Sequence, residues 1–229
     1  MDKENGDTLW YDAIQKEMAN VWVAFKIIEE KQAPPGYMRI PCRMIFTIKM
    51  DFTRKARYVA GGHVTDPPAS ITYSSVVSRE SVCIIFLIAT LNDLDVLAGD
   101  IGNAYLYATT IEKVYIITGP EFGEDEGKIA LIVRALYGLK GSGAAWHTHF
   151  AQHFSDLGFI PCKSDPDVWR RPATKRDGTE YYEYMVVYVD DLLAVSESPM
   201  PILTQLQDKF NYKINSIGPP DMFLGAKIG

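Results

Sequence analysis

The sequence lacks the features that define several protein classes. Its 229 residues include three cysteines, Cys42, Cys83 and Cys162, far apart and odd in number. This excludes a disulfide framework and a cysteine-based zinc site, and it favours a reducing, intracellular setting. No apolar stretch reaches the roughly 18 residues that a membrane span needs, and the polar stretch 1–5 is not a secretory signal. We therefore expect no membrane partner.

The chain also lacks an overall excess of positive charge. Its 23 basic and 29 acidic residues give a net charge of −6, which by itself argues against a nucleic-acid partner. The distribution of charge matters more than the sum. Between Arg39 and Gly62 six basic residues stand against one acidic residue, a local balance of +5. This segment is therefore a candidate surface for a polyanion.

There are no internal repeats and no low-complexity linker. The length fits one large domain or two interleaved small ones. Hydrophobic periodicity predicts helices over 8–20, 78–91, 143–157 and 200–210. Strands are predicted over 43–49, 55–60, 97–106 (a short strand and a turn), 114–117, 129–133, 181–195 (a hairpin) and 222–228. Because these elements show no βαβ rhythm, the expected class is α+β.

The most informative segment is Tyr188-Val189-Asp190-Asp191, between the apolar runs 185–187 and 192–195. The flanks predict two strands, so the two aspartates stand at the tip of a hairpin. Crowded carboxylates need a counter-charge to remain ionised. A solvated turn is the alternative for the pair taken alone. A metal ion is the stronger interpretation, and it indicates chemistry at a phosphate.

Phosphoryl transfer with two metal ions needs a third carboxylate near the pair. Asp100 is the best candidate, because it ends an apolar strand and precedes small residues that allow a ligand to approach closely. Asp93 and Asp95 are alternatives, although they are typical of a polar turn between a helix and a strand. The sequence therefore predicts that Asp100, Asp190 and Asp191 form one site.

Several motifs stand in a fixed order around these carboxylates. They are Lys55-Ala56-Arg57-Tyr58-Val59-Ala60, Asp100 with Ala104-Tyr105-Leu106, Leu136-Tyr137-Gly138-Leu139-Lys140 with Trp146, Leu157-Gly158-Phe159 with Asp165, and Phe223-Leu224-Gly225. Together with the hairpin, they resemble the reverse transcriptase domain of copia-type (Pseudoviridae) LTR retrotransposons. The resemblance runs in family order from Trp10 to Ile228, nearly the whole chain.

The resemblance implies an RNA-directed DNA polymerase with a right-hand fingers–palm fold. The fingers would comprise 1–77 and 108–141, and the palm 78–107 and 142–229. A thumb, an RNase H segment, an integrase and a protease are not in the sequence, so the expectation is a fragment of a larger polyprotein with the thumb absent. A cytoplasmic virus-like particle or the nucleus would be its location.

The resemblance also implies the roles of individual residues. Asp100, Asp190 and Asp191 would be catalytic and would bind two Mg²⁺ ions, or Mn²⁺ as a substitute, with the carbonyl of Ile101. The partners would be a primed RNA or DNA template and deoxynucleoside triphosphates. The residues expected at the nucleotide are Lys49, Arg57, Tyr105, Tyr137 and Gly138, with the Tyr105 ring excluding a 2′-hydroxyl. Those expected at primer or template are Lys140, Tyr188, Met222, Phe223, Leu224 and Gly225.

Two departures from the family pattern leave alternatives open. Gly61-Gly62-His63 stands where the family usually has Lys-Gly-aromatic, so one fingers cation is missing. Gly141-Ser142-Gly143 replaces the usual Gln-Ala-Pro. One alternative is an impaired relic that only binds nucleic acid or a protein. The missing thumb and the altered fingers motif favour it, and the intact carboxylates oppose it. Another is a different palm enzyme, such as an RNA-templated RNA polymerase or a nucleotide cyclase.

Overall fold

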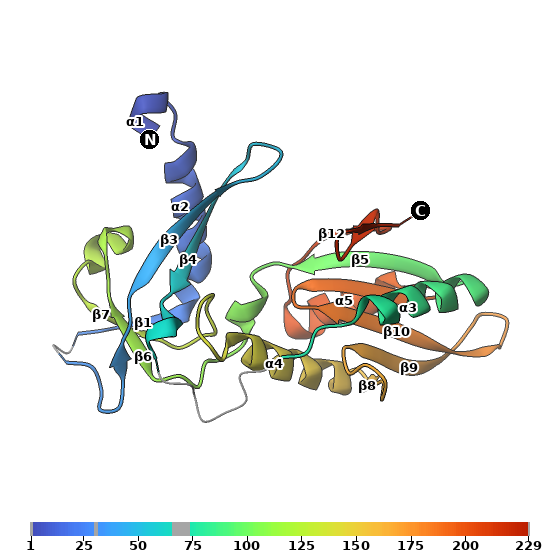
Figure 1. The fold of residues 1–229 in the computed structure, drawn as a ribbon. Helices are drawn as coiled ribbons and strands as arrows, with labels where there is room; N and C mark the ends of the chain where they lie inside the picture. The colour runs from blue at the N-terminus through green and yellow to red at the C-terminus, as the bar shows by residue number, and fades with distance from the viewer. Residues whose placement is uncertain (1, 30–31, 66–73, 229) are drawn as a thin grey trace. The chain divides into compact units, whose positions relative to one another are not determined.

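The computed structural model describes residues 2–29, 32–65 and 74–228 (Figure 1). The helices in these ranges are α1 Asp2–Asn5, α2 Leu9–Val21, α3 Arg79–Leu91, α4 Ser142–Asp156 and α5 Met200–Phe210. Short 3₁₀ helices are η1 Trp22–Ala24, η2 Gly62–Val64, η3 Ala104–Tyr107 and η4 Pro120–Asp125. Over the described residues, no helix has the length and apolar character needed to cross a membrane.

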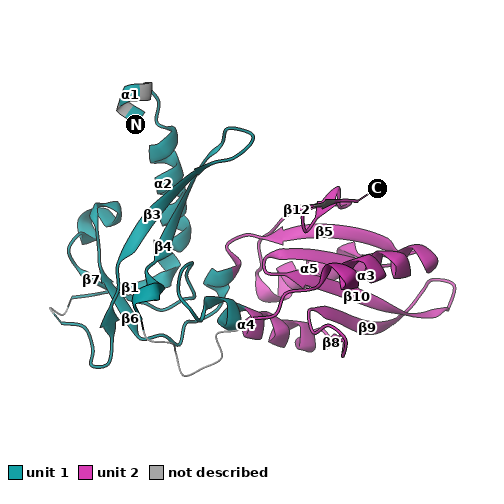
Figure 2. Cartoon of the chain, viewed as in Figure 1, with its two compact units in different colours: residues 1–73, 105–146 teal, residues 74–104, 147–229 magenta. Residues whose placement is uncertain are grey.

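The chain divides into two compact units, shown in different colours in Figure 2. Unit 1 comprises Met1–Tyr73 and Tyr105–Trp146, and unit 2 comprises Ser74–Ala104 and His147–Gly229. Each unit is therefore built from two separate stretches of sequence.

Unit 1 contains a four-stranded sheet and a separate two-stranded hairpin. The sheet has the order β1 Phe25–Ile28, β7 Ile129–Ile132, β6 Val114–Ile117 and β2 Met38–Arg39. The hairpin pairs β3 Cys42–Ile48 with β4 Arg54–Ala60 in antiparallel register. Helix α2 contacts β4. Phe25, Tyr58 and Phe122 meet edge to face in the core beside them.

Unit 2 is built on a six-stranded antiparallel sheet. Its order is β12 Ile214–Gly218, β5 Asp95–Ile101, β11 Asp191–Ser196, β10 Glu180–Tyr188, β9 Val168–Thr174 and β8 Ile160–Pro161. A small hairpin, β13 Met222–Phe223 with β14 Ala226–Lys227, follows β12.

Both faces of the central strand β11 are buried. On one face Leu193 and Val195 share a hydrophobic cluster with Ile85 and Ala89 of helix α3. The alternate residues of β11, such as Leu192, point to the opposite face and are also fully buried. A strand covered on both faces reads as a continuous apolar run, and this is the pattern of 192–195.

The α+β class and most of the predicted elements are confirmed. Helix α5 has the predicted bounds, and Ser78 caps α3 by accepting a hydrogen bond from the Ser81 amide at 3.1 Å. The prediction of one strand over 222–228 is wrong, because Leu224 and Gly225 have positive φ angles and turn the chain into the β13–β14 hairpin. Among the described residues, five strands lie outside the predicted ranges: β1, β2, β8, β9 and β12. β9 contains two arginines and Pro172, which obscure a strand pattern.

Candidate active site

Four polar residues form a row across four neighbouring strands of unit 2. Asp191 at the start of β11 is the register partner of Asp100 in β5. Asp100 is also the partner of Asn215 in β12, and Asp191 is the partner of Tyr188 in β10. Opposite residues of antiparallel strands point to the same face of a sheet. The row therefore places two of the predicted carboxylates side by side, with an amide on one flank and a phenol on the other.

The third aspartate lies in the turn between β10 and β11. Val189 has a φ of 58°, a left-handed conformation that is unusual for a β-branched residue. The Asp190 carbonyl accepts a hydrogen bond from the Ile101 amide at 2.8 Å, so the turn is tied to the end of β5. In an antiparallel ladder, the pair that follows such a bonded pair is not hydrogen-bonded and its side chains are closer. This brings the Asp100 and Asp191 carboxylates toward each other.

The charges of these aspartates interact. Asp191 is exposed as a residue, but the surrounding protein removes part of the hydration of its carboxyl group. This loss of hydration, with the added charges of Asp190 and Asp100, raises the pKa of Asp191 to about 6. Like charges that share a site shift a carboxyl pKa in this direction. The three aspartates therefore form one electrostatic group.

The donor chemistry of this group fits a hard divalent cation. Carboxylate and carbonyl oxygens are the ligands that Mg²⁺ prefers, and a cation would offset the crowded negative charge. Across the ranges 2–29, 32–65 and 74–228, no three His, Cys, Asp or Glu side chains are grouped closely enough to hold a metal ion. The aspartates are thus adjacent in the sheet without forming a closed coordination shell.

A cavity of about 400 Å³ lies beside the carboxylates. Asp100 and Asp191 line it together with Ser216 and the segment 219–225. Met222 is largely exposed at its edge, whereas Phe223 is buried and anchors the β13–β14 hairpin. The structure therefore brings the predicted primer residues Met222, Phe223, Leu224 and Gly225 to the same cavity as two catalytic candidates.

The residues predicted at the nucleotide lie in unit 1. The Tyr105 and Tyr137 rings are in contact, with centroids 5.0 Å apart. Gly138 has a φ of 92°, and a Cβ there would lie 2.0 Å from the Ala60 carbonyl oxygen. The Ala60 amide donates to the Tyr137 carbonyl at 2.7 Å. The glycine is therefore required, because it lets Tyr137-Gly138 pack directly against the end of β4.

Lys49 and Arg57, the two cations predicted at the nucleotide, lie farther apart than the Tyr105 and Tyr137 rings. Arg57 lies opposite Ile45, and Lys49 follows the end of β3. Both fall on the same face of the hairpin, but at roughly 3.4 Å per residue they are about 14 Å apart along the strands. The Lys140 ammonium donates a hydrogen bond to the carbonyl of Thr65, the residue that follows η2. This bond ties Lys140 to the end of η2.

Two motif positions have structural roles that the sequence did not indicate. The Asp165 carboxylate accepts a hydrogen bond from the Ser78 amide at 3.1 Å and so holds the start of α3. A Cβ on Gly61 would lie 2.7 Å from Cγ of Pro41, so there is little room for the family's usual lysine here. Asn215 was also missed, because nothing in its local sequence indicates that β12 pairs with β5.

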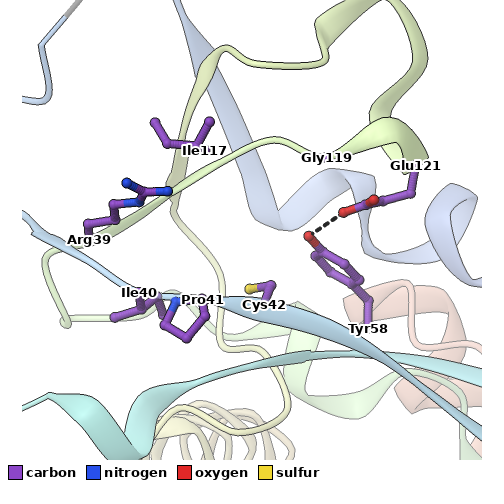
Figure 3. A pocket seen from close by; sticks show the side chains of 8 residues that line it. All are labelled: Arg39, Ile40, Pro41, Cys42, Tyr58, Ile117, Gly119 and Glu121. Carbon is purple, nitrogen blue, oxygen red and sulfur yellow. Dashed lines mark hydrogen bonds between the residues drawn. The ribbon is translucent and has the colours of Figure 1, made fainter.

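A second cavity, of about 510 Å³, lies in unit 1 (Figure 3). Eight residues line it: Arg39, Ile40, Pro41, Cys42, Tyr58, Ile117, Gly119 and Glu121. The Tyr58 hydroxyl faces Glu121 and donates to it at 2.7 Å. Burial, with the Glu121 charge, raises the pKa of Cys42 to about 12, so this thiol stays protonated at neutral pH. No residue predicted for nucleotide or primer binding is among these eight.

Sequence comparison identifies the family. The family described as Reverse transcriptase (RNA-dependent DNA polymerase) matches residues 24–229. This chain belongs to the reverse transcriptase family. The resemblance inferred from the motifs is confirmed.

Among similar proteins is the Retrovirus-related Pol polyprotein from transposon RE1 of Arabidopsis thaliana. It is 28% identical over 220 residues, covering 90% of this reverse transcriptase chain and 15% of the relative. The Truncated transposon Ty1-A Gag-Pol polyprotein of Saccharomyces cerevisiae is 28% identical over 208 residues, covering 88% and 16%. The chain therefore spans about one-sixth of the length of these relatives.

A similar solved structure is a foamy viral protease-reverse transcriptase in complex with double-stranded DNA. It covers 91% of this chain and 31% of its own, at 16% identity and a TM-score of 0.47.

Proposed function

We propose that this chain is the RNA-directed DNA polymerase module of a copia-type retrotransposon polyprotein. It extends a primer on an RNA or DNA template with deoxynucleoside triphosphates. The observation that carries the proposal is the pairing of Asp100 with Asp191, with Asp190 in the adjoining turn. A cytoplasmic particle or the nucleus is the compartment that this function requires.

Asp100, Asp190 and Asp191, with the Ile101 carbonyl, are the ligands of two Mg²⁺ ions. Such ions lower the pKa of a primer 3′-hydroxyl and offset the charge of a triphosphate, and Mn²⁺ can replace them. The contribution of the protein is positioning: strand pairing holds the carboxylates together before any substrate binds. Tyr188 lies in the same row and contacts the primer end. The segment 222–225 lines the adjoining cavity and holds the primer.

The unit 1 residues bind the nucleotide and the template. Lys49 and Arg57 contact the triphosphate, Arg57 through the planar fork that suits phosphate oxygens. Tyr105 lies under the sugar, and its contact with the Tyr137 ring limits its movement. Gly138 lines the same pocket, and Lys140 stays near the template. In this proposal the fingers correspond to 1–77 and 108–141, and the palm to 78–107 and 142–229.

Primer extension tests this proposal. The purified chain is given Mg²⁺, deoxynucleoside triphosphates and a labelled DNA primer on an RNA template. The wild type and Asp95→Asn are expected to extend the primer, and Asp190→Asn is expected to lose extension. Asp95 is the matched control, because it lies at the opposite end of β5, where its partner is Ser196.

Two outcomes would contradict the assignment. Extension that survives in Asp190→Asn would show that the activity does not come from this site. A wild-type chain that binds a fluorescent primer–template without incorporating nucleotides would instead support a fragment that only binds nucleic acid.

A further inference from the structure

Asp100 has a hydrogen-bond donor on the side away from Asp191. The Asn215 side chain donates from Nδ2 to Oδ2 of Asp100 at 3.2 Å. Both residues are partly buried, and they are register partners in β12 and β5. Asp100 therefore lies between a like charge on β11 and a neutral amide on β12.

The backbone around this contact leaves room for the amide. A Cβ on Gly102 would lie 2.8 Å from Nδ2 of Asn215, so a larger residue there would displace the amide. The Gly102 amide donates to the Lys213 carbonyl at 2.9 Å and holds β12 in register on the other side of Asn215. Glycine at 102 therefore leaves the space that the Asn215 amide occupies.

A bulge follows Asn215 directly. The pairing of β12 with β5 shifts register between Asn215 and Gly218, and Ser216 has a φ of 53°. Bulges redirect a strand and are frequent beside active sites. The Asn215–Asp100 pair is the last pair before the bulge, and pairing resumes at Gly218 with Ala98. Ser216, within the bulge, lines the 400 Å³ cavity.

We propose that Asn215 is a positioning residue for the carboxylate of Asp100. A carboxylate bound to a cation is usually held by a second group, and loss of that group lowers metal affinity or activity by about 10- to 100-fold. A neutral amide suits this role, because it fixes Oδ2 without an added charge and leaves Oδ1 for the cation. The inference rests on the proposed function, since the cation it serves is the polymerase metal ion.

The test compares Asn215→Leu, which keeps the side-chain size without a donor, with Asn215→Gln, which keeps the amide. Ile214→Val is the matched structural control, because it trims the neighbouring residue of β12 without changing a polar group. Mn²⁺ affinity is measured from the electron paramagnetic resonance signal of free Mn²⁺. Primer extension gives kcat and the KM for deoxynucleotide, and thermal unfolding gives the melting temperature.

Asn215→Leu is expected to weaken Mn²⁺ binding and to lower kcat, each by about 10- to 100-fold, with little change in KM. Asn215→Gln is expected to recover part of both losses. Ile214→Val is expected to bind Mn²⁺ as the wild type does, even where its melting temperature falls as far as that of Asn215→Leu.

The inference is overturned if Asn215→Leu matches Ile214→Val in Mn²⁺ affinity and kcat, or if Asp100→Asn leaves Mn²⁺ binding unchanged. The two proposals can fail separately. Extension by the wild type with no effect of Asn215→Leu removes only the role of Asn215. Mn²⁺ binding that depends on Asp100 and Asn215, in a chain that does not polymerise, supports Asn215 and removes the polymerase assignment.

Discussion

Asp191 of β11 lies directly opposite Asp100 of the neighbouring strand β5. The pair stands at the end of the sheet where the chain turns from β10 into β11. Helix α3 packs on the same face further along the strands, against Leu193 and Val195. The fold thus places two like charges together at the edge of a buried hydrophobic layer. Such an arrangement favours ligand binding over stability.

Asp191→Asn is expected to lower primer extension by about 100-fold or more, because a preorganised charge is lost. Its melting temperature in metal-free buffer is expected to equal or exceed that of the wild type, because one of three crowded charges is removed. Thermal unfolding and primer extension on the same samples check both effects. A melting temperature below that of the wild type, with the Asp95→Asn control unchanged, would contradict the explanation.

Tyr105→Ala is expected to reduce the preference for deoxynucleotides over ribonucleotides by at least about 10-fold, the usual scale for a single steric contact. The reason is that the Tyr105 ring, packed on Tyr137, is the proposed barrier to a 2′-hydroxyl. Tyr107→Ala, in the same 3₁₀ helix, is the control, because its ring packs on Trp146 instead. Single-nucleotide incorporation measures the preference. An unchanged ratio would favour another kind of palm enzyme.

His147 is expected to make folding stability depend on pH. Its Nε2 contacts Oδ1 of the buried Asp167 at 2.9 Å, and this hydrogen bond raises the pKa of His147 above its usual 6.5. A histidine whose pKa is raised by folding stabilises the protein fully below its unfolded pKa. That contribution is lost as the pH rises through the folded value.

His147→Leu is expected to cost about 1–3 kcal/mol at pH 6, because it leaves a buried acceptor without this donor. The difference from wild type should shrink toward pH 9. Urea unfolding across this range measures it, and His147→Gln, which keeps a donor without titrating, is the control. A difference that is constant with pH would show that His147 acts only by packing.

Gly61→Ala is expected to destabilise the chain by about 1–3 kcal/mol, the usual cost of overpacking. A Cβ there would lie 2.7 Å from Cγ and 2.8 Å from the carbonyl oxygen of Pro41. Gly218→Ala is the control, because a Cβ at 218 meets nothing within 4 Å. Thermal unfolding compares the two. Equal stability of both variants would show that Pro41 moves aside.

The sequence by itself determined the elements whose signals are local. The apolar spacing and Ser78 cap of α3, the bounds of α5 and the two strands β3 and β4 all depend on residues close together in the chain. The carboxylates at 190 and 191 were placed beside a turn for the same reason.

Only the tertiary structure decided which distant residues meet. Asp95 and Asp100 lie on the same strand, and the β5–β11 register brings Asp100, not Asp95, opposite Asp191. Asn215 joins Asp100 from 115 residues away, through a strand too short and polar to predict. Strand pairing between distant segments is set by the packing of the whole sheet, which local sequence does not encode. The sequence thus named the carboxylates, and the fold decided which of them are neighbours and which amide holds one of them.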